Sequence, residues 1–257
     1  MILLYFLLSG ITGFIGFKVT ALTKGGAIAA TIVGTAIAYG FEWRGLLLLG
    51  IFFLSSTIWS KYKARKKEAI GDIVEKGSAR DQYQVIANGG AAAFAGIMMA
   101  FFPSNWWLVF FLSVLAASNS DTWASELGVL SKRPPFHIKK RQFVPPGTSG
   151  AVSLFGLIAS FLGALLIGSV GSLVFDVSLA ILLCVTLGGF IGCLFDTLIG
   201  ASLQEEFRCQ ICGIKTERHE HCQAATLRIK GFSGLNNDVV NFISSIIGGL
   251  SGGVWFL

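Results

Sequence analysis

The chain has 257 residues, of which 53% are hydrophobic and 13% charged. Water-soluble domains are about 25% charged, so this composition excludes an ordinary soluble enzyme. It also excludes disorder, which requires low hydrophobicity. The five cysteines are too few and too scattered for a secreted disulfide scaffold. The formal charge of +6 would indicate nucleic-acid binding only if the cations gathered on one soluble surface.

Eight apolar stretches follow one another along the chain. A helix needs roughly 20 residues to cross a bilayer core about 30 Å thick, and each stretch comes near that length, although the second and third are short. The first lacks the basic leading segment and the cleavage site of a signal peptide. We therefore predict an all-α fold, a polytopic transmembrane helix bundle of about eight spans, with residues 1–257 as a single transmembrane domain. The stretches are Ile2–Phe17, Ala27–Phe41, Gly45–Trp59, Gln84–Phe102, Trp106–Glu126, Ala151–Gly168, Ser178–Leu203 and Leu235–Leu257.

Basic residues occupy every second loop. All but one of the 20 lysines and arginines follow odd-numbered stretches, and the exception is Arg44. Because basic loops stay cytoplasmic, we expect both termini outside and a multi-pass protein of the cell membrane, with the lipid bilayer as its first partner. The positive charge is then explained by the orientation of the loops in the membrane, which argues against nucleic acid as a partner. The oligomeric state is left open.

Polar residues gather where the even-numbered stretches begin, at the cytoplasmic face. Helix N-termini offer free N–H groups and partial positive charge to phosphates. Alternatives stay open: Lys24 suits a positive-inside anchor equally well, asparagines cap helices, and Pro-Pro-Gly makes rigid turns. The candidate phosphate- or substrate-binding residues are Lys24, Gly25, Arg80, Asn88, Gly147, Thr148, Ser149, Gly150, Asn237 and Asn241.

Four acids lie at the same depth as these groups: Asp121, Glu126, Asp196 and Asp238. Ionisable residues inside spans are functional candidates by default. Carboxylates beside phosphate-binding amides would repel the ligand unless a cation intervened, and Mg²⁺ is held by carboxylates together with substrate phosphates. The sequence therefore predicts a magnesium–polyphosphate site, with these four acids as catalytic metal ligands. An interhelical hydrogen bond or a salt bridge to Arg80 explains any single acid as well, but not all four in alignment.

The cytoplasmic loop of residues 205–230 holds a second candidate site. Cys209 and Cys212 form a C-x-x-C-G run, which is typical of a zinc knuckle. We predict Cys222 and His219 as the other ligands of a structural Zn²⁺, because adjacent residues such as His221 and Cys222 rarely chelate one ion well. A redox pair or free cytosolic thiols is the alternative.

Six segments together resemble a known family. It is the integral membrane family catalogued as domain of unknown function 92, which includes transmembrane protein 19 and the plant phytyl-phosphate kinase. The resemblance runs in order across nearly the whole chain. Its segments are Leu22–Ala27, Arg80–Asp81 with Gln84–Gly90, Ser120–Gly128, Val144–Gly150, Asp196–Gln204 and Leu235–Asn241.

The resemblance implies, for the plant branch, phosphoryl transfer from a nucleotide to a prenyl monophosphate. We therefore expect a phosphotransferase that uses CTP or ATP and a prenyl- or polyprenyl-phosphate lipid, giving the diphosphate. The chain has no G-x-x-x-x-G-K-[ST] run, so its nucleotide site is not a P-loop. The main rival is a transporter or lipid flippase, whose polar groups should lie near the bilayer midplane. A lipid-bound scaffold without chemistry would leave the acids unexplained.

Overall fold

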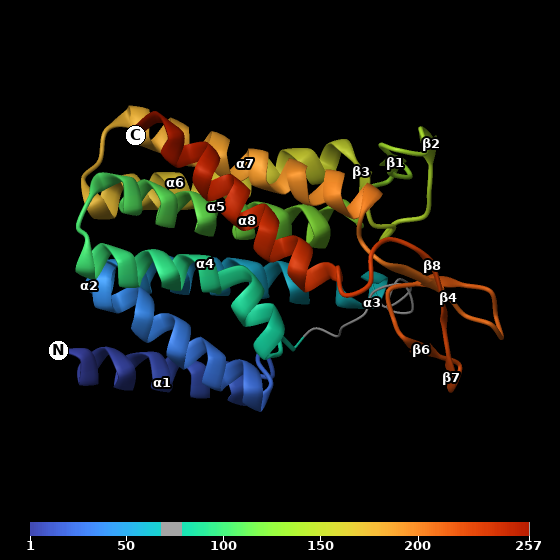
Figure 1. Cartoon of the computed structure of the whole chain (residues 1–257), viewed down its shortest axis with the longest axis horizontal. Helices are drawn as coiled ribbons and strands as arrows, with labels where there is room; N and C mark the ends of the chain where they lie inside the picture. Colours follow the sequence, from blue (N-terminus) through green and yellow to red (C-terminus); the bar gives the residue numbers. More distant parts are fainter. Residues whose placement is uncertain (68–78, 257) are drawn as a thin grey trace.

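The computed structural model describes residues 1–67 and 79–256. Long helices run side by side along one body, with both termini at one end and the strands at the other (Figure 1). Each apolar stretch is helical over most of its length, and Leu257 at the end of the last stretch lies outside the described residues. The helices are α1 (Ile2–Lys18), α2 (Lys24–Lys61), α3 (Ala64–Lys67), α4 (Gln82–Phe101), α5 (Asn105–Gly128), α6 (Leu154–Phe175), α7 (Leu179–Ser202), α8 (Asn237–Gly253) and the 3₁₀ turn η2 (Val254–Phe256).

Helix α2 is two antiparallel helices joined at Glu42. The backbone of Glu42 is not helical, with φ 53° and ψ −149°. A Cβ built on Gly34 would lie 3.5 Å from a side-chain carbon of Leu46, whereas twelve residues of straight helix span about 18 Å. The arms, residues 24–41 and 43–61, correspond to the second and third predicted stretches.

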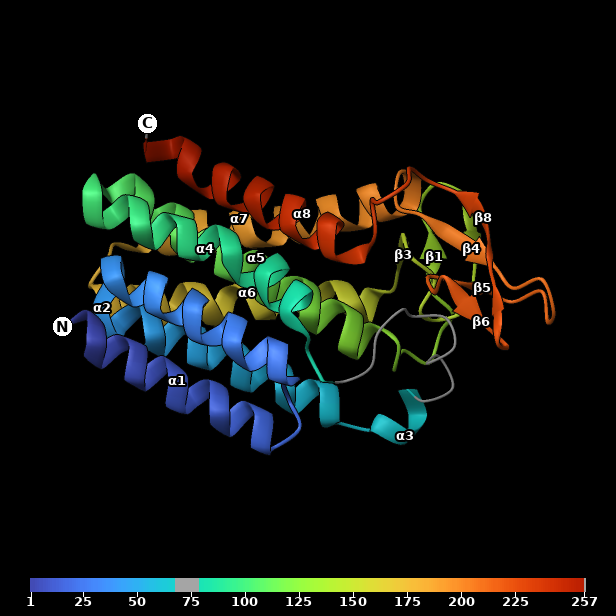
Figure 2. The ribbon, with the colours of Figure 1, turned by 60° about the horizontal axis from the view of Figure 1, so that its bottom comes forward.

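Helix α5 runs through the centre of the bundle. Its residues from Leu108 to Ser120 are all buried, because α4, α6, α7 and α8 pack around it. The outer helices instead turn large apolar side chains outward, such as Leu3, Phe14 and Leu173. Helix α1 forms one edge, against α2 (Figure 2). An apolar exterior around a packed core is what a bilayer requires.

Five helices in the described ranges are long and apolar enough to cross a membrane: α2, α4, α6, α7, and α8 continued through η2. Helix α1 is apolar but has only 17 residues, and α5 ends in a polar run from Ser118 onward. The chain is therefore a helical, multi-pass membrane protein. The number of crossings and the side on which the termini lie stay predictions.

The two longest described loops contain short antiparallel strands, which the all-α prediction did not include. One sheet has the order β2-β1-β3, a second has the order β5-β4-β8, and β6 pairs with β7. Strands this short carry too few residues for an alternating pattern to show in the sequence. They are β1 (Phe136–His137), β2 (Gln142–Phe143), β3 (Ala151–Val152), β4 (Glu206–Arg208), β5 (Lys215–Thr216), β6 (Glu220–His221), β7 (Ala224–Ala225) and β8 (Leu227–Lys230).

Candidate functional site

Two of the predicted acids meet inside the bundle. Asp121 on α5 and Asp196 on α7 lie close enough for their charges to repel each other. The Ser244 hydroxyl on α8 donates to Oδ2 of Asp196 across 3.0 Å. The Asn241 amide, oriented with its nitrogen toward Asp196, donates to the same oxygen across 2.9 Å. Among the described residues, neither carboxylate is ion-paired with a lysine or arginine.

The other two acids are placed differently. Glu126 forms an ion pair of 2.6 Å with Nζ of Lys67, so a cation of the protein already neutralises it. Asp238 is 8% exposed in the first turn of α8. In the part of the chain that the structure describes, no three carboxylates come close enough to share an ion. The four acids are therefore not gathered into one site, and the two whose charges interact are Asp121 and Asp196.

The start of α8 adds amides to this pair. Asn236 caps the helix, since its side chain accepts from the Val239 N–H across 3.1 Å. Asn237 is the first helical residue, and its carbonyl accepts from the Asn241 amide across 3.1 Å. Ser244 was not among the predicted site residues. Its spacing of three residues from Asn241, on the same helix face, is the signal that would have found it.

Arg80 lies at the junction of three segments. Its backbone pairs with Leu22 as an isolated parallel bridge. Its guanidinium donates to the Thr57 hydroxyl across 3.1 Å and lies 5.3 Å from the centroid of the Phe53 ring. Burial lowers the pKa of Arg80, and the negative charge of Glu126 opposes that shift. The structure thus holds a full positive charge at the end of the bundle where α4 begins.

The glycines that open α2 serve packing. Lys24 is exposed, while a Cβ on Gly25 would collide with the Gln82 side chain and one on Gly26 with the Arg80 carbonyl oxygen. The start of α2 therefore packs directly against the start of α4. Gly25 itself is half-buried, and the approach of a phosphate to it stays a prediction.

An apolar cavity of about 110 Å³ lies between α1, both arms of α2 and α4. Arg80, Gln84 and Asn88 line it. Gln84 and Asn88 share one face of α4, whereas Arg80 reaches the cavity from the segment before that helix. The remainder of its lining is mostly aliphatic and aromatic, including Leu22, Val33, Leu46, Leu49, Phe52 and Val85. The lining of the cavity is therefore mostly apolar, and we call its polar part, formed by Arg80, Gln84 and Asn88, the border of the cavity.

A hydrogen bond joins α4 to the helix that carries Asp121. The Ser118 hydroxyl on α5 donates to the Asn88 carbonyl across 2.9 Å. Asp121 follows Ser118 by three residues, and residues at that spacing share a helix face. The polar side of α4 and the carboxylate of Asp121 therefore lie on the same side of α5.

The segment 147–150 does not open a helix, contrary to the prediction. Strand β3 follows it, and Ser153 is the residue that caps α6 by accepting from the Gly156 N–H across 3.1 Å. Gly147, Thr148 and Ser149 instead line a second cavity of about 350 Å³, while Gly150 packs against Ala201. Three lysines and three glutamates complete much of its lining: Lys140, Lys215, Lys230, Glu205, Glu206 and Glu217.

Side-chain hydrogen bonds tie this second cavity to α7. The Ser149 hydroxyl donates to the Gln204 side-chain oxygen across 2.8 Å. Nζ of Lys230 donates to the Gly200 carbonyl across 2.7 Å, and burial lowers the pKa of Lys230. Gly200 lies one turn beyond Asp196, so the cavity opens at the same end of the bundle as the acid pair.

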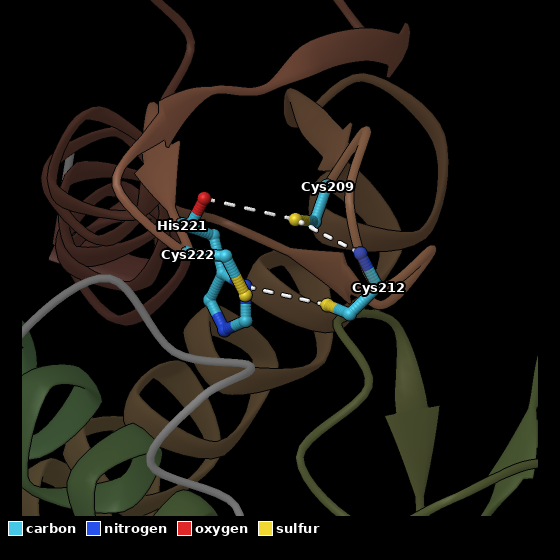
Figure 3. A group of neighbouring side chains, drawn as sticks. All are labelled: Cys209, Cys212, His221 and Cys222. Atoms are coloured by element: carbon cyan, nitrogen blue, oxygen red, sulfur yellow. Dashed lines mark hydrogen bonds between the residues drawn. The ribbon is translucent and has the colours of Figure 1, made fainter.

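Three cysteines and a histidine point toward one another in the strand-bearing loop (Figure 3). The ligand atoms of Cys209, Cys212, His221 and Cys222 all lie within 4.8 Å of one another. His219 is placed elsewhere, because its ring packs on Phe207 with centroids 4.5 Å apart. The structure therefore puts His221 where the sequence predicted His219.

The backbone of Cys222 explains this difference. Its φ of 52° is in the left-handed region, which L-residues with a side chain adopt at a cost. This turn brings its thiol within 3.2 Å of Nδ1 of the preceding residue, His221. Adjacent side chains point to opposite sides of an extended chain, whereas the left-handed backbone of Cys222 lets it share an ion with His221.

Backbone amides surround the first thiol. The Ile211 and Cys212 N–H groups donate to Sγ of Cys209 across 3.4 and 3.5 Å. These bonds, with the Cys212 N–H as the largest cause, lower the pKa of Cys209 to about 6. Hydrogen bonding to Cys212 raises the pKa of Cys222 to about 11.

The sequence is similar to those of known membrane proteins. The sequence profile of integral membrane protein DUF92 matches residues 7–249. The chain is 35% identical to an uncharacterized membrane protein of Methanocaldococcus jannaschii, over 91% of this chain and 86% of that one. No solved structure matches.

Two Arabidopsis thaliana proteins are also similar. Protein PGR is 28% identical over 94% of this chain and 91% of its own length. Protein VTE6, chloroplastic, is 27% identical over 90% of this chain, which spans 64% of that protein's length. The profile match across almost the whole sequence and the relative at 35% identity lead to one conclusion: this chain belongs to the DUF92 family of integral membrane proteins.

Proposed function

We propose that the protein transfers the terminal phosphoryl group of a nucleotide, CTP or ATP, to a prenyl or polyprenyl monophosphate. The observation that carries the proposal is the apolar cavity beside α1, α2 and α4, with Arg80, Gln84 and Asn88 on its border. A cavity of this size would take only the part of the apolar tail next to the phosphate. Its phosphate pairs with the guanidinium at the border, where charge-assisted hydrogen bonds are strong.

The acid pair supplies the other half of the site. Neutral donors contact Asp196, and the carboxylate of Asp121 interacts with it. Two neighbouring carboxylates suit Mg²⁺ held jointly with phosphate oxygens. Bound Mg²⁺ would neutralise charge on the transferred group. Glu126, paired with Lys67, does not fit that role, and Asp238 stays a proposed contributor from the neighbouring turn.

The proposed reaction needs no strong general base. An oxygen of the acceptor phosphate, already an anion, attacks the terminal phosphorus of the nucleotide. The bond between that phosphorus and its bridging oxygen breaks, and the nucleoside diphosphate leaves. Arg80 orients the acceptor, while Asn237 and Asn241 position the acid pair, so catalysis rests on placement and charge neutralisation.

We further propose eight crossings in the cell membrane, with both termini outside. The support is the alternation of basic loops together with the position of the termini opposite the strands (Figure 1). In this topology the acid pair, Arg80 and the second cavity all face the cytoplasm, where nucleotides are available.

The test uses the purified full-length protein in detergent with Mg²⁺, nucleotide labelled in its terminal phosphate, and a panel of prenyl monophosphates. We expect label in a lipid diphosphate. Asp196→Asn should lower kcat by about 10²-fold, because it weakens charge neutralisation in the transition state. Arg80→Gln should raise the KM for the lipid and leave the KM for the nucleotide unchanged.

Arg44→Gln is the matched control, since Arg44 is exposed at the opposite end of the bundle, and it should leave both constants unchanged. The proposal fails if no acceptor is labelled while proteoliposomes move the lipid without consuming nucleotide, which would establish the transporter instead.

A further inference from the structure

We infer that Cys209, Cys212, His221 and Cys222 together bind a zinc ion. Four soft or borderline ligands converge here: three thiol groups and one imidazole. Zinc in structural sites takes four sulfur and nitrogen ligands in a tetrahedron. The inference is independent of the phosphotransferase proposal.

The distances agree with a tetrahedral site. Zn–S bonds of about 2.3 Å and Zn–N bonds of about 2.0 Å place neighbouring ligand atoms about 3.5 to 3.8 Å apart. Nδ1 of His221 lies 3.4 Å from Sγ of Cys212 and 3.2 Å from Sγ of Cys222. All four ligand atoms fall within 4.8 Å of one another, so zinc needs only small side-chain adjustments to sit among them.

The surroundings favour a metal over a disulfide. A disulfide would join two of the sulfurs and leave the third thiol and the imidazole without a role. The two backbone N–H groups aimed at Sγ of Cys209 stabilise a thiolate, which is the form that binds metal. Cys209 is 1% exposed while Cys212 and Cys222 are exposed, so one ligand is anchored in the fold and the ion can enter from solvent.

The ligands come from separate structural pieces, which gives the ion a role. Cys209 and Cys212 lie in the turn between β4 and β5, whereas His221 and Cys222 lie at the β6–β7 hairpin. Zinc would therefore join that hairpin to the β5-β4-β8 sheet. Lys215 and Lys230 of this sheet line the second cavity, so the ion would hold one wall of that cavity in place.

The experiment measures metal in the full-length protein, purified in detergent without added metal, by mass spectrometry. We expect about one zinc ion per chain. His221→Ala should reduce the zinc content at least tenfold, and Cys209→Ser should do the same. His219→Ala and Cys184→Ser are the matched controls, because both side chains lie outside the cluster, and both should keep the ion.

A second measurement guards against variants that fail to fold. Chelation of the wild-type protein should make the peptide bonds after Lys215 and Arg218 sensitive to trypsin, and zinc should restore resistance. The inference is overturned if the wild-type protein carries no zinc, if it carries iron instead, or if two of its three loop cysteines are found joined in a disulfide. It is also overturned if His219→Ala loses the ion and His221→Ala does not.

Discussion

Glu42 turns the chain between the two arms of α2 in a conformation that suits glycine. Its φ of 53° and ψ of −149° lie near a region of backbone space that glycine occupies almost alone, and other residues there carry strain of about 1–3 kcal/mol. The exposed side chain points away from the packed core. A turn of this kind lets two helices return on each other without a loop.

Replacing this residue tests the strain directly. Glu42→Gly should raise the free energy of unfolding by about 1 kcal/mol, because relief of 1–3 kcal/mol exceeds the roughly 0.5–1 kcal/mol entropic cost of glycine. Thermal unfolding in detergent measures the change. Glu42→Ala is the control, since it removes the same carboxylate but keeps the Cβ, and it should not stabilise the protein. Equal stabilisation by both variants would contradict the strain argument.

Sequence spacing predicted some site residues and missed others for physical reasons. Gln84 and Asn88 were placed on one face because helix periodicity is regular, and both line the same cavity. Arg80 lines it too, but from the segment before α4 and not from the helix. His221 was missed because the ligand choice depends on the φ of Cys222, a property that no spacing encodes. The phosphate-binding role of Gly25 stays a prediction, since a glycine in a sequence suits close packing and phosphate approach equally well.

Between elements, one buried amide joins three helices. Asn119 on α5 is fully buried. Its Nδ2 donates to the Gly163 carbonyl of α6 across 2.8 Å, and its Oδ1 accepts from Ser55 of α2 across 3.1 Å. Interhelical hydrogen bonds of this kind contribute modestly to stability in membranes. The bond fixes the register of α5, which carries Asp121 two residues later.

Close backbone contact fixes the first arm of α2 against α4. A Cβ on Gly96 would collide with the Ala36 carbonyl oxygen and lie 2.8 Å from Cα of Ile37. Gly96→Ala should therefore force the two helices apart and lower the free energy of unfolding by about 1–3 kcal/mol. Gly50→Ala is the matched control, because nothing lies within 4 Å of a Cβ there, and it should not lower the melting temperature, since alanine suits a helix better than glycine. An unchanged melting temperature for Gly96→Ala would refute the close contact.

The positions of the helices were predictable because each needs a long apolar run, and length identifies such runs on its own. The residue at which each helix starts was harder to predict. Helix α6 begins at Leu154, because the preceding Ala151–Val152 pair with β1 as strand β3. This pairing joins residues that are not neighbours in the sequence, such as His137 and Ala151. An apolar residue such as Ala151 fits a helix and a strand alike, so the sequence does not reveal the pairing.

At the scale of the whole molecule, all loops that bear strands lie at one end, and both termini lie at the other (Figure 1). Ser104 and Ser233 are exposed residues before α5 and before α8, at the terminal end and the strand end respectively. In bacterial spheroplasts, a membrane-impermeant thiol reagent should modify Ser104→Cys at once. It should modify Ser233→Cys only after permeabilisation.

The wild-type protein controls for the native thiols, because the exposed Cys212 and Cys222 lie at the strand end and should not react from outside. Reaction of Ser233→Cys in sealed spheroplasts would invert the proposed topology. Reaction of both variants there would contradict the alternation of crossings.

The gathering of polar groups at one end of the bundle has a consequence for the lipid itself. A phosphorylated headgroup processed at that end would start and finish in a single leaflet, since the middle turns of the long described helices, with the arms of α2 taken separately, carry no lysine or arginine to accompany it across. Any diphosphate made there would accumulate asymmetrically across the bilayer, and its delivery to the far leaflet would fall to a different protein.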